Sequence, residues 1–217
     1  MTDTQTPESI AARLRDQFAP AYLTLTSIIQ GVALSALVVR VEATGERFDL
    51  ANWLLAAATL LAFLLVWHEY LMQALAYVWL PTLLDSTVPF AFLVAELFMA
   101  HFVYGNERAW LLAAGVAYTI GLAAYAVRRT QTYRHQQENA GVVRAITGFA
   151  GPRLAFSIVP AVLYLAAWAL YDVLGLGRAP AVVAALAVVV VIIVILGTIP
   201  YWQRVLAYAR SARPANR

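Results

Sequence analysis

The sequence contains no cysteine and no lysine, and only 12% of its 217 residues carry a charged side chain. The absence of cysteine excludes a disulfide scaffold and a thiolate metal site. The absence of lysine excludes a retinal Schiff base, because that bond needs an amine side chain. A soluble domain has about 25% charged residues, so this chain has too few charges to cover a surface that faces water. Its net charge of +3, with the basic residues spread between apolar runs, also argues against a nucleic-acid-binding protein.

What the sequence has in excess is hydrophobic residues, which make up 62% of the chain. A helix that crosses a bilayer needs ~20 mostly apolar residues. Six runs have about this length or more, namely 22–39, 51–80, 82–104, 109–127, 154–174 and 179–199. The sequence therefore predicts an all-α, polytopic membrane protein with six transmembrane helices.

Arginine supplies all 15 basic residues, and its distribution predicts the orientation of the helices. Cytoplasmic segments of membrane proteins carry an excess of basic residues. If both termini are cytoplasmic, eleven arginines fall in inner segments and four in outer ones. We therefore expect both termini in the cytoplasm. The chain then divides into a cytoplasmic interfacial arm (1–21), helices one to four (22–127), a cytoplasmic loop (128–153), helices five and six (154–203) and a basic cytoplasmic tail (204–217).

The cytoplasmic loop contains a further apolar pattern. Val142, Val143, Ile146 and Phe149 recur at helical spacing after a polar stretch that ends at Asn139. A helix with one apolar face can lie on a membrane surface, where its basic residues reach anionic headgroups. The loop is therefore predicted to hold an amphipathic segment on the cytoplasmic leaflet, and a solvated loop is the alternative.

Carboxylates inside the apolar runs mark the first candidate functional residues. A carboxylate at the centre of a membrane helix costs ~2.5 to 3.5 kcal/mol on insertion scales, so each one needs a partner. Glu96 is the deepest, and Asp85, eleven residues earlier, lies on the same helical face. Asp85 follows Pro81 closely, which favours a position at the inner interface or as the cap of the third helix.

The second run carries His68 beside a polar stripe in which Glu69 and Gln73 are one helical turn apart. If the second and third runs form an antiparallel hairpin that turns near Pro81, His68 lies within a turn of Glu96 and can pair with it. If the two runs are aligned from their outer ends instead, the two residues lie further apart. The candidate buried polar cluster is then His68, Glu69, Gln73, Asp85, Glu96 and His101. It predicts either an ion or proton pathway or a set of polar contacts that fix helix packing. The two histidines lack the spacing of zinc ligands, so we expect no metal and no cofactor.

The first run has small and hydroxylated residues on one face. Thr24, Ser27, Gly31 and Ser35 recur at steps of three and four, and Gln30 flanks them. Small residues on one face let another membrane helix approach closely. The alternative is a pore lining, in which hydroxyl and amide groups replace part of the hydration shell of an ion.

Two later runs also carry patterned small or polar residues. Gly115 and Gly121 in the fourth run each pair with a small residue four positions away, which predicts close helix packing. In the fifth run Ser157, Tyr164 and Tyr171 are seven residues apart, which predicts a polar and aromatic face that points into the protein.

Three features of the first half of the chain resemble a known family, the prokaryotic relatives of the endolysosomal potassium channel. They are the polar first helix around residues 27–32, the pair Trp67 and His68, and the pair Pro89 and Phe90. The resemblance covers about the first 105 residues. Where the family has its Arg and Phe-Ser-Asp signature, this sequence has residues 26–30, which contain neither the arginine nor the aspartate. It implies a bacterial inner-membrane protein whose first helices line a pore in an oligomer. The pore segment would then be Ser27, Ile28, Ile29, Gln30 and Gly31.

These observations leave three functions open. The first expectation is a homo-oligomeric channel or passive pathway for a small cation. The second is a non-catalytic subunit or adaptor that binds another membrane protein, and the third is a proton-coupled small-molecule carrier that uses Glu96 and His68. We expect no enzyme, because the sequence has no nucleophile elbow, Walker loop, dinucleotide fingerprint or paired-histidine protease motif. The expected partners are the lipid bilayer and further copies of the chain, without nucleic acid.

Overall fold

The computed structural model of the chain describes residues 7–78, 82–148 and 150–211. The regular structure in these ranges is entirely helical, which confirms the predicted all-α fold class. The long helices are α1 (Pro7–Thr44), α2 (Leu50–Ala76), α3 (Leu83–Phe102), α4 (Glu107–Arg134), α6 (Ala150–Ala169) and α7 (Pro180–Ser211). A shorter helix, α5 (Gln136–Ile146), and the 3-10 turns η1 (Gly45–Arg47) and η2 (Leu176–Arg178) lie between them.

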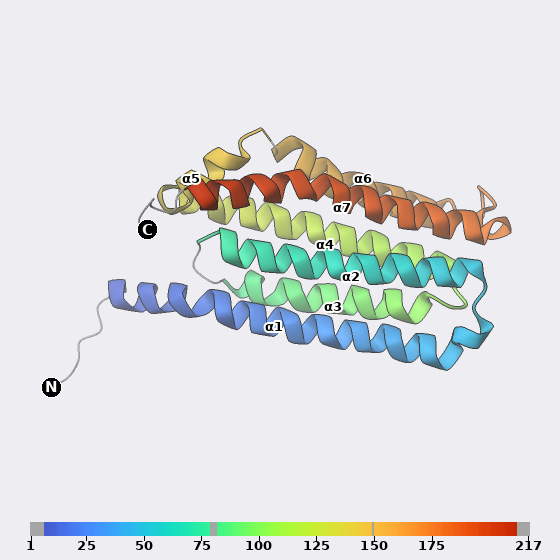
Figure 1. Ribbon diagram of the computed structural model, residues 1–217. Coiled ribbons are helices and arrows are strands. Elements are labelled where there is room, and N and C mark those ends of the chain that lie inside the picture. Colours follow the sequence, from blue (N-terminus) through green and yellow to red (C-terminus); the bar gives the residue numbers. More distant parts are fainter. Residues whose placement is uncertain (1–6, 79–81, 149, 212–217) are drawn as a thin grey trace.

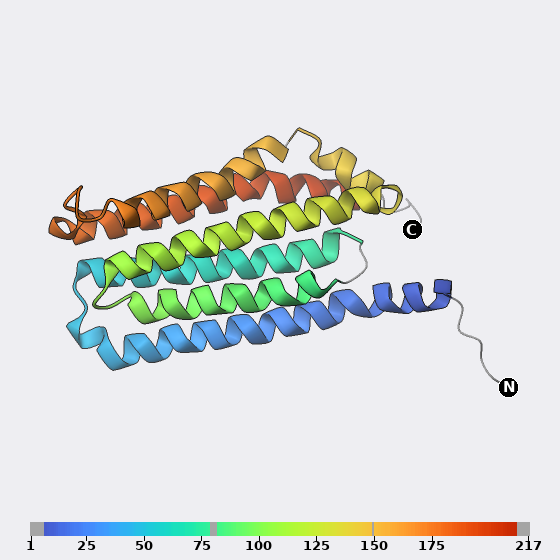
Figure 2. The ribbon, with the colours of Figure 1, turned by 180° about the vertical axis from the view of Figure 1, so that it is seen from behind.

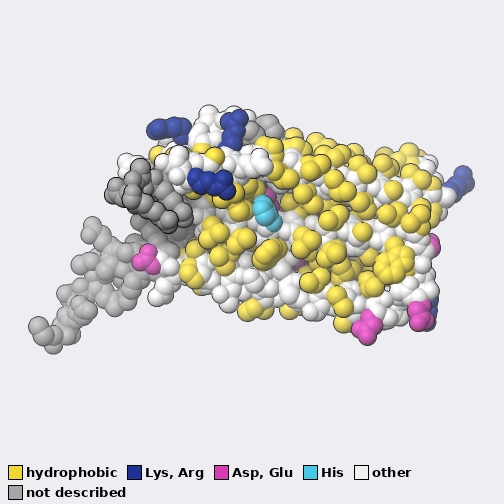
Figure 3. Space-filling view, in the orientation of Figure 1, with side chains coloured by type: hydrophobic (Ala, Val, Ile, Leu, Met, Phe, Trp, Pro, Cys, Tyr) yellow, Lys and Arg dark blue, Asp and Glu magenta, His cyan; other side chains and the backbone are white. Residues whose placement is uncertain are grey.

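Five helices of the described chain, α1, α2, α3, α4 and α7, are long and apolar enough to cross a membrane. The described apolar part of α6, Arg153–Ala169, is shorter. Apolar side chains cover most of the visible outer surface between the two ends of the bundle (Figure 3). These features are those of a multi-pass membrane protein, in which lipid surrounds the middle of the bundle.

The two ends of the bundle differ in charge (Figure 3). We call one the arginine-rich end; it carries Arg129, Arg134, Arg144, Arg204 and Arg210. The opposite end carries five acids, namely Glu42, Glu46, Asp49, Glu107 and Asp172. Helix α1 begins and helix α7 ends at the arginine-rich end (Figure 1).

The helix ends differ from the ends of the apolar runs. Helix α1 is continuous from Pro7 to Thr44, so residues 7–21 of the predicted arm and the first crossing form one helix. Helix α4 continues to Arg134, and α7 continues to Ser211, inside the predicted basic tail. Apolar runs mark the part of a helix that lipid surrounds, whereas a helix ends where its last backbone groups find other partners.

The long helices form two layers of three, one with α1, α2 and α7 and the other with α3, α4 and α6 (Figures 1 and 2). In each layer the middle helix packs between the other two, α2 between α1 and α7 and α4 between α3 and α6. The layers join at their edges, where α1 packs on α3 and α6 packs on α7. Helices α2 and α3 follow each other in the chain but lie in different layers and touch little.

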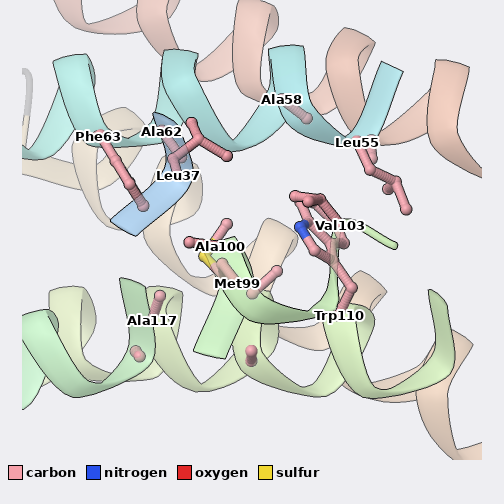
Figure 4. Packing of buried hydrophobic residues seen from close by; sticks show 14 of the residues in the cluster. Leu37, Leu55, Ala58, Ala62, Phe63, Met99, Ala100, Val103, Trp110 and Ala117 are labelled. Carbon is pink, nitrogen blue, oxygen red and sulfur yellow. The ribbon is translucent and has the colours of Figure 1, made fainter. Parts of the chain in front are cut away.

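Buried side chains close the space between the layers near the opposite end. Leu55, Val103 and Trp110 meet there and are almost fully buried (Figure 4). The indole Nε1 of Trp110 donates to Thr59 Oγ1 at 2.9 Å, and Asn52 Nδ2 donates to the carbonyl oxygen of Val103 at 2.9 Å. These bonds tie α2 to α4 and to the end of α3.

Helices α4 and α6 pack closely at Gly115. A Cβ at this position would lie 2.7 Å from Cδ2 of Leu165 and 3.2 Å from its backbone nitrogen. The predicted close packing of the fourth run is therefore confirmed at Gly115, because only a residue without a side chain fits there. At Gly121 the nearest atom to such a Cβ is Phe92 Cζ at 3.6 Å, which is ordinary contact.

Gly115→Ala is expected to lower the free energy of unfolding by about 1–3 kcal/mol, the usual cost of overpacking a core. Gly31→Ala is the matched control, because no atom lies within 4 Å of a Cβ at Gly31. Alanine is the better helix former, so this variant should be as stable as the original or more so. Unfolding in mixed micelles with a denaturing detergent measures both. Equal stabilities of the two variants would contradict the close approach of α4 and α6.

Candidate functional site

A cavity of about 120 Å³ lies inside the bundle and is lined by α2, α3, α4, α6 and α7. Ala114 and Arg128 both line it and are fourteen residues apart on α4, so it extends for about 21 Å along that helix. Its deep part is apolar, with Ala62 and Met99 facing Ala114, one turn from the buried Trp110. Its other part, toward the arginine-rich end, carries the charged residues.

Glu69 holds three helices together at the polar part of this cavity. Its Oε2 accepts from Gln73 Nε2 at 3.1 Å and from Arg153 Nη2, and its Oε1 accepts from Trp202 Nε1 at 3.0 Å. The Arg153 guanidinium also lies over the rings of Tyr201 and Trp202, 5.0 and 5.7 Å from their centroids. The predicted Glu69 and Gln73 stripe is therefore part of a network that joins α2 to α6 and α7.

Other donors at the cavity have no acceptor. The hydroxyls of Tyr70 and Tyr118 and Nη1 of Arg153 are buried and form no hydrogen bond within the described part of the chain. Arg128 also makes no hydrogen bond or ion pair among the described residues. These four side chains come from α2, α4 and α6, and all of them line the cavity.

A second, smaller cavity of about 20 Å³ adjoins the first. It is also lined by Tyr70, Gln73 and Arg128, and it adds Asp85 of α3 and Gln131 of α4. Because Gln131 lies one turn closer to the end of α4 than Arg128, the polar space continues toward the arginine-rich end.

The predicted pairing of His68 with Glu96 is wrong. Glu96 accepts from Gln30 Nε2 of α1, at 2.9 Å to Oε1 and 3.0 Å to Oε2, and is 1% exposed. His68 instead packs edge-on against Trp202 of α7, with the ring centroids 6.4 Å apart. The prediction assumed that α2 and α3 pack against each other as a hairpin. In the structure, the helix of the other layer that packs on α3 is α1.

Asp85 and His101, two other members of the predicted polar cluster, also lie apart from the remaining members. Asp85 Oδ2 accepts from the backbone nitrogen and the hydroxyl of Thr82, both at 2.7 Å, so its predicted role as a helix cap is confirmed. His101 was predicted to be buried, but it is exposed near the opposite end and packs against Phe102. The six residues therefore occupy several separate places and do not form one cluster.

The predicted pore segment also divides between two faces of α1. Ile29 and Gln30 are buried inside the bundle, whereas Ser27, Ile28 and Gly31 are exposed on its outside. Consecutive residues of a helix are about 100° apart, so five in a row cannot share one face. A pore between first helices of different subunits would contain only the exposed set.

Helix α5 forms where the spacing of the loop residues predicted a helix, but its apolar face packs on the bundle. Val142 and Ile146 contact the buried cluster of Tyr77, Tyr201, Trp202 and Val205; Phe149 lies outside the described residues. Asn139 fixes the helix to the end of α2, with Oδ1 accepting from the Val78 nitrogen at 2.9 Å and Nδ2 donating to its carbonyl at 2.7 Å. Burial raises the pKa of the Tyr77 phenol, which shares a hydrogen bond with Tyr201.

The polar and aromatic face of the fifth predicted run points into the protein at Tyr164 and Ser157, as expected. Tyr164 is buried and donates to the carbonyl of Ala187 at 3.1 Å, and Ser157 lines the cavity. The sequence reasoning missed the cavity residues of α4. Tyr118, Gly121, Tyr125 and Arg128 follow steps of three and four, the spacing of one helical face, and this signal identifies them.

Arg153→Met should lower the free energy of unfolding by about 3–5 kcal/mol, because it leaves the Glu69 carboxylate buried without its charged partner. The double variant Glu69→Gln with Arg153→Met removes both charges and is expected to recover much of that loss. Detergent-induced unfolding of the single and double variants provides the measurement. A double variant that is less stable than Arg153→Met alone would show that the pair does not act as a unit.

Comparison of the sequence with protein-family models, with curated proteins and with solved structures finds no match. The resemblance of the first half of the chain to the potassium-channel relatives stays a hypothesis.

Proposed function

We propose that the chain is a six-span membrane protein of the bacterial inner membrane, with the arginine-rich end in the cytoplasm, and that it carries a small molecule in its central cavity. Helix α6 has 20 residues, or about 30 Å, enough for a sixth crossing of the hydrocarbon core. The excess of arginine at one end agrees with the usual orientation of membrane proteins.

The observation that carries the proposed function is the cavity within a single chain, whose buried donors lack acceptors. Buried polar groups in proteins nearly always have partners, and a group without one costs about 1–3 kcal/mol. A bound molecule that supplies acceptors removes this cost. The cavity therefore has the character of a binding site more than that of a space left by imperfect packing.

The shape of the interior supports a carrier over an open pore. The cavity extends toward the arginine-rich end, while Leu55, Val103 and Trp110 fill the interior near the opposite end. A solute bound in the cavity therefore has access from the arginine-rich end. Its release at the opposite end requires α2 and α4 to separate at Trp110. Alternating exposure of one site to two sides is how carriers work.

Ala124→Phe is expected to prevent occupation of the cavity, because Ala124 lines it one turn before Arg128. Ala123→Phe is the control, since Ala123 is exposed on the outside of the same helix. Native mass spectrometry of the purified protein should find a bound small molecule on the original protein and on the control, and at least tenfold less on Ala124→Phe. No bound mass on any of them, or equal occupancy of the three, would contradict the proposed function.

A cation pathway between first helices of a homo-oligomer is the second candidate function, favoured by one observation. Ser27 and Gly31 are exposed on the outer face of α1, and no atom lies near a Cβ at Gly31. Such a face would be free to line a pore or to pack on a partner membrane protein.

For this second candidate we expect a potassium flux into proteoliposomes that Gly31→Leu reduces at least tenfold by filling the pore. Val32→Leu adds bulk at the next exposed position and is expected to leave the flux within about twofold, because a pore between copies would be lined by the small-residue face. Flux measured with a potassium-sensitive dye tests both. A protein without flux, or with flux that neither variant alters, is not a channel of this kind.

A further inference from the structure

The unpaired donors of the cavity define the chemistry of what it binds. Tyr70 is only 4% exposed, yet its hydroxyl has no partner among the described residues, and the same holds for the hydroxyl of Tyr118 and Nη1 of Arg153. Arginine offers N–H donors and no acceptor, and a tyrosine hydroxyl can also donate. Tyr118 is ten residues, or about 15 Å, from Arg128 along α4, so the unpaired donors near Arg128 are those of Tyr70 and Arg153. The complementary ligand therefore carries acceptor atoms for these groups at one end.

The charges at the cavity favour an anion. Arg128 and Arg153 line it, and Glu69 is the acid that lines it with them. The Glu69 oxygens accept from Gln73, Arg153 and Trp202, and in the adjoining cavity Asp85 Oδ2 accepts from Thr82. Glu69 attracts Arg128 electrostatically, but Arg128 makes no hydrogen bond or ion pair among the described residues, so its N–H groups can bond to an acceptor from outside the chain. A planar guanidinium matches a carboxylate or a phosphate group in geometry and charge.

The deep part of the cavity is apolar, which excludes a small inorganic anion as the complete ligand. Ala62, Met99 and Ala114 line this deep part. Ala114, at its far end, is about 21 Å from Arg128 along α4. Apolar spaces of this kind bind apolar groups and do not favour water. A ligand that fills the cavity therefore has an oxyanion at one end and an apolar body behind it.

We propose that the cavity binds a single-chain anionic amphiphile, with its carboxylate or phosphate held by Arg128 and Arg153 near Tyr70 and its apolar chain directed past Tyr118 toward Met99 and Ala114. This inference rests on the proposed function and names the class of molecule that the carrier takes. The oxyanion lies toward the arginine-rich end, where a molecule from the inner leaflet or from the cytoplasm would present its charged group. A free fatty acid and a single-chain phosphate lipid share this chemistry.

Four probes of equal chain length test the proposal on the full chain purified in a neutral maltoside detergent. Dodecanoate and dodecyl phosphate distinguish the two sources of oxyanion, and dodecyltrimethylammonium and dodecanol test charge. We expect one or both anions to raise Tm in a saturable manner, and the cation and the alcohol to bind at least tenfold more weakly. Equal effects of all four probes, or no effect of either anion, would overturn the proposal.

Variants then locate the anion. Arg128→Gln should weaken binding of the preferred anion at least tenfold, whereas Arg129→Gln, which removes the same charge from an exposed neighbour, should change it less than twofold. Arg128→Lys keeps the charge and should retain part of the affinity. If Arg128→Gln does not fold, displacement of a bound fluorescent fatty acid from the original protein by the four probes gives the same ranking. Equal affinities of the Arg128→Gln and Arg129→Gln variants would overturn the assignment.

The two proposals can fail separately. A bound molecule that Ala124→Phe removes but Arg128→Gln leaves in place would uphold the carrier and reject the anionic class. Binding of an anion that Ala124→Phe does not affect would place the anion outside the cavity and reject the inference. An original protein without any bound molecule, and without a response to any probe, would reject both.

Discussion

Charged groups that lie out of water must find partners inside the protein, and this constraint organises the bundle. Glu69 shows this most clearly, because its carboxylate accepts hydrogen bonds from residues of α2, α6 and α7. Gln30 and Glu96 meet the same requirement between α1 and α3. In lipid there is no water to replace a lost partner, so these contacts fix which helices are neighbours as strongly as apolar packing does.

The cavity exists because the sizes of side chains change along α2 and α4. Near the opposite end Leu55 and Trp110 are bulky and fill the space between the layers. Nearer the arginine-rich end the facing positions include Ala62, Ala117 and Gly121, and these side chains are too small to meet across the layers. Helices α2 and α4, the middle helices of the two layers, are thus in contact near the opposite end and separated nearer the arginine-rich end. A binding site that is open on one side needs this geometry.

Local features of the structure followed from the sequence, whereas contacts between distant residues did not. Asp85 caps α3 and Gly115 allows α6 to approach, because each of these depends on a short stretch of chain and its immediate surroundings. His68 and Glu96 were expected to pair on the assumption that consecutive helices are neighbours. The assignment of α2 and α3 to different layers depends on the fit of all six long helices, and no local pattern encodes it.

The sequence by itself determined that the chain is helical and that most of its long helices belong in a membrane, because composition and run length report the solvent of each segment. It also carried the helical spacing of Tyr118, Tyr125 and Arg128, but spacing cannot say what a helical face meets. Only the tertiary structure decided that this face borders an internal cavity, that Arg153 neutralises Glu69, and that Arg128 makes no ion pair among the described residues. Pairing of charges depends on distances of a few ångströms between helices far apart in the chain, and those distances arise when all the helices pack together.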